Sequence, residues 1–141
     1  MIRYLLAVGF VAVCLGAAAN TTGYAQNPSP EGALIEKLQN SIIQTVGAQE
    51  KTVEVAISGN ILTVARINSK LNGSTHGARS NEAKAIASVV IKGISDRPDL
   101  KNLHTIRVQY LTRPGSASKG KVLDTVDFRK DPNGVFQFHE T

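Results

Sequence analysis

Residues 52–66, TVEVAIS-GN-ILTVAR, give the clearest structural signal in the chain, a β-hairpin. Apolar and polar side chains alternate on both sides of Gly59-Asn60, a dipeptide that favours a two-residue hairpin turn. Pairing Ser58 with Ile61 sets the register and brings the apolar side chains of both strands to one face. That face comprises Val53, Val55, Ile57, Leu62, Val64 and one charged residue, Arg66. We expect Arg66 at the end of the sheet, where its stem packs and its guanidinium reaches water or an anion.

Two amphipathic helices are predicted around this hairpin. Ser29 can cap a helix that starts at Pro30 and ends near Gly47. Its apolar stripe is Leu34, Ile35, Leu38, Ile42 and Val46. A second helix, capped by Ser80, is predicted over residues 81–95 with the face Ala83, Ile86, Ala87, Val90 and Ile94. Because alanine and Gly93 make that face thin, we expect this helix to lie close to the sheet and to be the more buried of the two.

The remaining segments complete an α+β pattern. Residues 68–79 are polar and glycine-rich, which predicts a long loop of functional interest before the second helix. Alternating strands follow over residues 103–111 and 121–128, with a short last strand over 135–139. The order α-β-β-α-β-β(-β) predicts a two-layer sandwich, in which a mainly antiparallel sheet of 4–5 strands carries both helices on one face.

The first 25 residues have the layout of a cleaved secretory signal peptide. Arg3 precedes an apolar run over residues 4–19, and the simplest cleavage site lies between Ala25 and Gln26. An uncleaved anchor, a lipoprotein signal at Cys14 and a buried helix are the alternatives. The apolar run is short for a transmembrane helix, which needs about 20 apolar residues. We therefore expect export to the periplasm or the cell exterior, with residues 26–141 forming one small domain and no membrane span after cleavage.

Removal of the signal peptide changes which functions remain open. Cys14 is the only cysteine, so the mature chain would have no disulfide, no thiol catalysis and no thiolate metal ligand. Loss of Arg3 lowers the formal net charge from +5 to +4, an excess common among secreted proteins. Few aromatic residues stand among the lysines and arginines, which argues against nucleic acid as a partner.

No pattern typical of a catalytic or metal site is present. The motifs HExxH and GxSxG, the phosphate-binding loop and Cys/His clusters are missing from the sequence. His76, His104 and His139 are not at helical ligand spacing, although they could still meet in space. Asp124 and Asp127 fall on opposite faces of a strand and cannot form an acid–base pair with each other. Glu82 falls in the first turn of helix 81–95, where the helix dipole favours a carboxylate. We therefore predict no catalytic residue, no metal and no cofactor.

Basic residues supply a candidate anion site. His76 and Arg79 stand beside Gly73 and Gly77, whose backbone N–H groups could add to such a site. Three further cations, Arg113, Lys119 and Lys121, surround the connection over residues 113–120. Arg129 and Lys130 belong to the opposite end of the sheet. The alternative is that all of these residues are solvated charges that keep the protein soluble.

Three functional hypotheses follow. In the first, the chain is a non-enzymatic accessory module that binds another envelope protein through the sheet face away from the helices. That face comprises Glu54, Ala56, Ser58, Thr63, Ala65, Thr105, Arg107 and Gln109. In the second, Arg79, Arg113, Lys119 and Lys121 bind anionic lipid or polysaccharide. The third, an enzyme or metal protein, has the least support. The sequence leaves the ligand and the oligomeric state open.

The order helix, hairpin, helix, strand over residues 34–111 is similar to that of BON domains. These small envelope modules are associated with phospholipid surfaces, so the resemblance implies an anionic lipid surface as partner. The predicted loop over residues 68–79 and the strands after Arg113 depart from the compact BON pattern.

Overall fold

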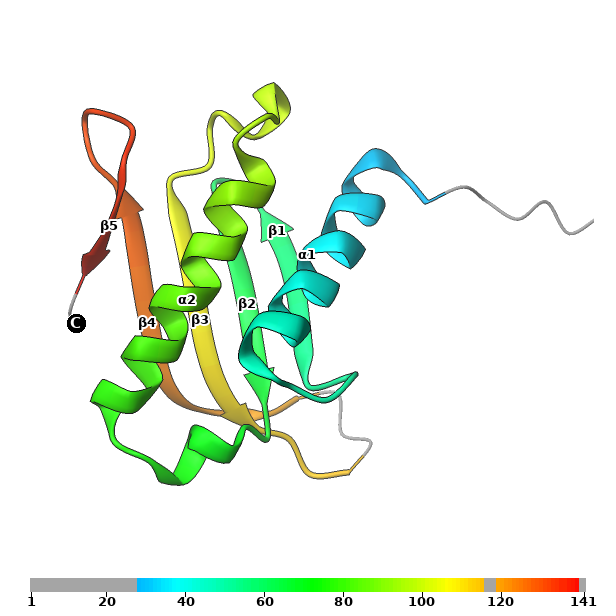
Figure 1. Cartoon of the computed structure of the whole chain (residues 1–141), viewed down its shortest axis with the longest axis vertical. Helices are drawn as coiled ribbons and strands as arrows, with labels where there is room; N and C mark the ends of the chain where they lie inside the picture. Colours follow the sequence, from blue (N-terminus) through cyan, green and yellow to red (C-terminus); the bar gives the residue numbers. More distant parts are fainter. Residues whose placement is uncertain (1–27, 116–118, 140–141) are drawn as a thin grey trace, which may run out of the picture.

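The computed structural model describes residues 28–115 and 119–139. The elements in chain order are α1 (Pro30–Val46), β1 (Val53–Ser58), β2 (Ile61–Ile67), the 3-10 helix η1 (Lys70–Gly73), α2 (His76–Ile94), the 3-10 turn η2 (Pro98–Leu100), β3 (Thr105–Thr112), β4 (Lys121–Lys130) and β5 (Phe136–His139) (Figure 1). The predicted signal peptide, its cleavage site and residues 116–118 of the predicted connection lie outside the described residues. Within the described ranges, no helix combines the length and the apolar character that crossing a bilayer requires.

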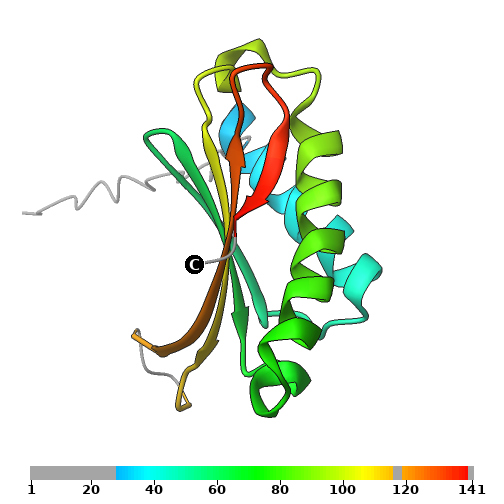
Figure 2. The ribbon, with the colours of Figure 1, turned by 90° about the vertical axis from the view of Figure 1, so that its left-hand side faces the viewer.

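The five strands form one mixed sheet in the order β1-β2-β3-β4-β5. β2 and β3 are parallel, and the other neighbours are antiparallel. A parallel pair needs a crossover connection, which here contains α2. Both helices lie on the same side of the sheet, and no described helix covers the other side (Figure 2). The predicted α+β sandwich and its element order are confirmed.

The hairpin of β1 and β2 has the predicted register. Ser58 pairs with Ile61, and Val53 pairs with Arg66 at the other end. Gly59 has a φ of +59°, a left-handed conformation that glycine adopts without a steric penalty. The apolar face packs into the core, where Val53, Val55, Leu62 and Val64 are buried.

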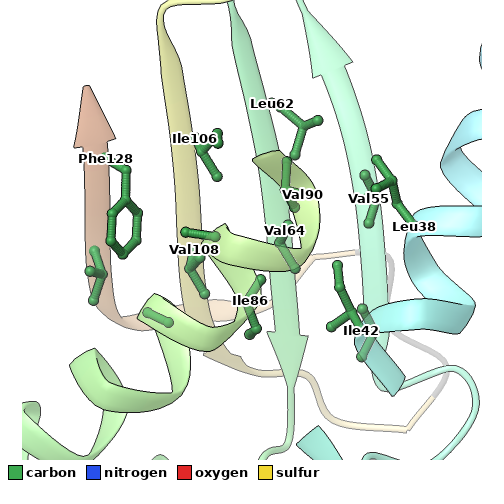
Figure 3. Close-up of a cluster of buried hydrophobic side chains, with 14 of the residues drawn as sticks. Leu38, Ile42, Val55, Leu62, Val64, Ile86, Val90, Ile106, Val108 and Phe128 are labelled. Atoms are coloured by element: carbon green, nitrogen blue, oxygen red, sulfur yellow. The ribbon is translucent and has the colours of Figure 1, made fainter. Parts of the chain in front are cut away.

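The core fills the space between the two helices and the sheet. Figure 3 shows Leu38 and Ile42 of α1 and Ile86 and Val90 of α2 directed towards the strands. The strands contribute Val55, Leu62, Val64, Ile106, Val108 and Phe128 to the same cluster. α2 buries Ser80, Ala83, Ile86, Ala87 and Val90, whereas α1 buries Leu34, Leu38 and Ile42. The expectation that the second helix is the more buried one is confirmed.

Both predicted signals at the ends of α1 are confirmed. The Ser29 hydroxyl accepts a hydrogen bond from the Gly32 N–H at 3.0 Å, and Gly47 ends the helix with a φ of +62°. Gly93 permits close contact between the helices, because a Cβ there would lie 2.5 Å from Leu38 Cδ2. The thin face of α2 therefore has a packing function.

The predictions for residues 68–82 need three corrections. Residues 68–79 are not a long loop, because they contain η1 and the first turn of α2. Thr75, not Ser80, caps α2 and accepts a hydrogen bond from the Ala78 N–H at 3.2 Å. Glu82 consequently lies in the second turn rather than the first. The apolar periodicity missed this start because the first turn of α2 binds polar groups instead of the core.

The expectation for Arg66 is confirmed. It lies at the end of β2, and its side chain is largely buried, with 5% of the residue exposed. The Arg66 Nε atom donates to Glu82 Oε1 at 2.8 Å. The anion that Arg66 reaches is thus a side chain of α2, and the ion pair links the hairpin to this helix.

Candidate functional site

The sheet face away from the helices, called the open face below, presents three rows of side chains. Strand register aligns Glu54, Ala65, Gln109 and Thr125 in the first row. The second row is Ala56, Thr63, Arg107, Asp127 and His139. The third row is Ser58, Ile61, Thr105, Arg129 and Gln137. All eight residues proposed from the sequence for a partner-binding face therefore share this surface.

Charge on the open face is concentrated around Asp127. Arg107 Nε donates to Asp127 Oδ1 and Arg107 Nη2 donates to Asp127 Oδ2, both at 2.8 Å. Arg129 Nη2 lies 3.7 Å from the same Oδ2 atom. The Asp127 side chain is 3% exposed, whereas the Arg107 and Arg129 side chains are 33% and 53% exposed. Two guanidiniums thus cover one carboxylate and leave a positive excess at the surface.

The hydrogen bonds in this cluster fix its charges. Those from Arg107 hold the pKa of Asp127 below its ordinary value, against the opposing effect of burial. The same bonds raise the pKa of Arg107. Both groups are therefore ionised at neutral pH, and Arg129 supplies the uncompensated charge.

A second ion pair lies at the edge of the open face. The Arg113 guanidinium binds both carboxylate oxygens of Glu54, and Arg113 Nη2 lies 3.0 Å from Oε2. Asn68 holds the Arg113 backbone through two hydrogen bonds of 2.9 Å. The hydrogen bond from Arg113 also holds the pKa of Glu54 below its ordinary value. Arg113 is therefore engaged with the first strand of the sheet.

Two of the predicted anion-binding residues meet on an internal carboxylate. His76 Nδ1 and Arg79 Nε lie 2.8 Å and 2.6 Å from Asp124 Oδ2. Arg79 Nη1 also donates to the backbone carbonyls of Leu71 and Ser74. Burial alone would raise the pKa of Asp124, but the hydrogen bonds from Arg79 and His76 hold it below its ordinary value.

The other predicted basic residues lie apart from this pair. Asp124 faces α2, whereas Arg113 binds Glu54 at the edge of the open face. Lys119 and Lys121 are exposed at the end of the connection. Arg129 pairs with Thr105, and Lys121 pairs with Thr112, which confirms that Arg129 lies at the opposite end of the sheet. The positions of Asp124 and Asp127 on opposite faces of β4 are confirmed as well.

A polar network continues from Asp124 into the core. The Tyr110 hydroxyl lies 2.9 Å from the Arg79 carbonyl oxygen and 3.1 Å from Glu82 Oε1. Burial and the Glu82 carboxylate raise the pKa of Tyr110. The network therefore fastens the first two turns of α2 to β3 and β4.

Ser80, His76 and Asp124 are connected in the order found in a serine hydrolase. Ser80 Oγ lies 3.2 Å from His76 Nε2, and His76 Nδ1 binds Asp124. Ser80 is only 6% exposed, and it does not line any of the larger cavities in the described part of the molecule. Arg79 also occupies the carboxylate that would orient the imidazole. The arrangement fits a structural clamp at the start of α2.

Metal-ligating side chains are dispersed in the described part of the chain. No three His, Cys, Asp or Glu side chains there come close enough to hold a metal ion. His76 belongs to α2, His104 precedes β3 and His139 belongs to β5.

A groove of about 650 Å³ lies between the end of α2, η2 and the β4–β5 turn. Ile91 and Val135 line it and are 37% and 52% exposed. None of its lining residues is buried, and the Lys130 ammonium lies 5.1 Å from the Phe136 ring centre. The groove is therefore shallow, and it offers no buried polar group that would select a ligand.

Comparisons with protein-family models, curated proteins and solved structures find no match for this chain. The topological resemblance to BON domains is thus without support from these comparisons, and the function rests on the geometry described above.

Sequence reasoning placed Arg107 on the open face but missed its pairing with Asp127. The signal was present, because antiparallel pairing of residues 103–111 with 121–128 brings the two residues to neighbouring strands. The length of the connection between them left the register undetermined.

Proposed function

We propose that this chain is an exported, non-enzymatic binding module whose open face docks an acidic surface of another envelope protein. The observation that carries this proposal is the cluster of Arg107 and Arg129 around a single buried carboxylate, on a face that no described helix covers. Export rests on the predicted signal peptide.

The chemistry of the cluster favours an acidic partner. Arg107 satisfies both oxygens of Asp127, so Arg129 retains its charge and more than half of its side-chain surface. The cross-strand neighbours of Arg129 are Thr105 and Gln137, which are uncharged, so a partner's carboxylates can approach the guanidinium. Guanidinium–carboxylate contacts of this kind give both geometric specificity and faster association.

Binding to anionic lipid or polysaccharide through the four predicted basic residues is less well supported. Arg79 and Arg113 already bind Asp124 and Glu54. Of those four residues, Lys119 and Lys121 are the two that are exposed, and both lie at the connection between β3 and β4.

Charge reversal at the cluster provides the test. The mature protein is immobilised, envelope extract is passed over it, and the recovered partner is then purified and titrated. We expect Arg129→Glu to weaken binding about tenfold or more, because it places a like charge against the partner. Lys37→Glu, an exposed charge change on α1, is the matched control and should leave the affinity unchanged.

Two outcomes would contradict the proposal. One is equal partner affinity for Arg129→Glu and the unmodified chain. The other is saturable binding to vesicles of anionic phospholipid that is abolished by the double variant Lys119→Glu/Lys121→Glu and is unchanged in Arg129→Glu. That result would favour binding to anionic lipid instead.

A further inference from the structure

A cavity of about 330 Å³ lies on the helix side of the molecule, away from the open face, between the end of α1 and η1. Figure 1 shows the C-terminal end of α1 and η1 at the same end of the fold. The lining residues that matter for its chemistry are Ala48, Arg66, Ser69, Lys70, Leu71 and Glu82. Its volume is at the lower end of the range for ligand pockets, which suits a small molecule or the end of a peptide.

Arg66, which lines this cavity, has one short hydrogen bond and three long ones. Its Nε and Nη2 atoms lie 2.8 Å and 3.4 Å from the two oxygens of Glu82. On the other edge, Nη2 lies 3.4 Å from Ser69 Oγ and Nη1 lies 3.5 Å from the Thr52 carbonyl oxygen. The three distances of 3.4 Å, 3.4 Å and 3.5 Å exceed the usual 2.7–3.2 Å of a good N–H···O bond. The Arg66 guanidinium, with 6% side-chain exposure, is thus held by one hydrogen bond of ordinary length and three longer, weaker ones.

The other charges around the cavity favour an anion that carries a single charge. Lys70 is exposed at the rim, and Glu82 is the only acidic lining residue. Arg66 and Lys70 together exceed Glu82 by one positive charge. A carboxylate matches that excess, and its planar pair of oxygens fits a guanidinium edge. Inorganic phosphate brings more negative charge close to Glu82.

We propose that this cavity binds a carboxylate, with its oxygens on the Nη1–Nη2 edge of Arg66 and the Lys70 ammonium at the entrance. Leu71 and Ala48 provide apolar surface for the carbon atoms that bear the carboxylate. The carboxylate can belong to a small organic acid or to the C-terminus of a peptide. The site is independent of the open face.

The experiment is a nuclear magnetic resonance titration of the isotope-labelled mature chain. The probes are sodium acetate, inorganic phosphate, and one short apolar peptide with either a free or an amidated C-terminus. We expect saturable shifts of the Arg66 Nε–H signal and of the amides of Ala48, Ser69 and Leu71. Selective saturation by acetate assigns a small-acid site, and selective saturation by the free peptide over its amidated form assigns a peptide C-terminus.

Rim variants keep the proposal testable without disturbing the buried ion pair. Lys70→Glu should weaken carboxylate binding about tenfold, because it reverses the charge at the entrance. Lys101→Glu, an exposed change at the opposite end of the fold, should leave binding unchanged. Equal affinity in Lys70→Glu, no saturable shift with any carboxylate probe, or tighter binding of phosphate than of both carboxylates would overturn the proposal. Arg129→Glu should not affect these shifts, so this result is separable from the fate of the open-face proposal.

Discussion

Arg107 on β3 and Asp127 on β4 are cross-strand partners whose side chains form two hydrogen bonds of 2.8 Å on the open face. The pair makes an otherwise uncharged part of the sheet into a defined electrostatic surface. It also explains how a carboxylate with 3% exposure is tolerated there, because a buried charge needs a hydrogen-bonded partner. Arg129 adds the positive excess on which the proposed function depends.

The Arg107–Asp127 pair should make stability depend on acid pH. The native pKa of Asp127 lies below its unfolded value of about 3.9, so the unfolded chain takes up more protons as the pH falls below about 5. The stabilising contribution of ionised Asp127 is therefore complete above about pH 5, and it is lost as the pH falls through the native pKa of Asp127. We expect Asp127→Asn to cost about 1–3 kcal/mol at pH 7 and to flatten the acid limb of the stability curve.

Urea unfolding at a series of pH values measures this effect. Glu36→Gln, on the exposed side of α1, is the control and should keep the acid limb of the unmodified chain. An acid limb that is equally steep in Asp127→Asn would show that this carboxylate is not responsible.

Tyr110 should resist ionisation in the native protein. Burial and the neighbouring Glu82 raise its pKa, so its phenol should stay neutral at a pH of about 10, where an exposed tyrosine ionises. A chain that starts at Gln26 retains Tyr110 as its only tyrosine, so near-ultraviolet absorbance follows this one residue. The contribution of neutral Tyr110 to stability should be complete below the pKa of tyrosine in the unfolded chain, and it should fall as the pH rises above that value. Phenolate absorbance that appears near pH 10 while circular dichroism stays native would contradict this account.

Two glycines of α2 should respond to alanine with opposite signs. At Gly93 a new Cβ would meet Leu38 Cδ2 at 2.5 Å, and Leu38 is buried, so we expect a net loss of about 1–2 kcal/mol. At Gly77 a new Cβ would lie 3.9 Å from Thr75 Oγ1, an ordinary contact distance, so alanine should stabilise the helix by up to about 1 kcal/mol. Thermal unfolding of both variants measures the difference. A stabilising Gly93→Ala would show that the helices are not in close contact there.

Much of the fold could be predicted because local rules determine it. The two-residue turn at Gly59-Asn60 fixes the hairpin register, and Ser29 and Gly47 mark the ends of α1. The parallel pairing of β2 with β3 was left open, because residues 61–67 and 105–112 are joined through a helix whose path the strand pattern does not encode. The start of α2 was missed because His76 and Arg79 contact Asp124 instead of apolar residues.

The candidate sites were harder to predict because they depend on pairing between distant segments. Arg107 was expected on the open face, but its partner depends on the β3–β4 register, which is interrupted between Tyr110 and Leu111. Arg66 was expected near an anion, yet Glu82 lies 16 residues further along the chain, in a helix whose start had been placed too late. In both cases the sequence placed the arginine correctly, but its carboxylate partner could be identified only from the structure.

Site-specific photocrosslinking in envelope extract tests whether the open face docks an acidic partner. A photoreactive side chain replaces Gln109, on the central strand β3 of the open face, or, as the matched control, the exposed Ser88 on α2. We expect one crosslinked protein from position 109, attached through an acidic segment and lost in Arg129→Glu, with no such product from position 88. A crosslink to the same protein from position 88 and none from position 109 would show that the open face is not the docking surface.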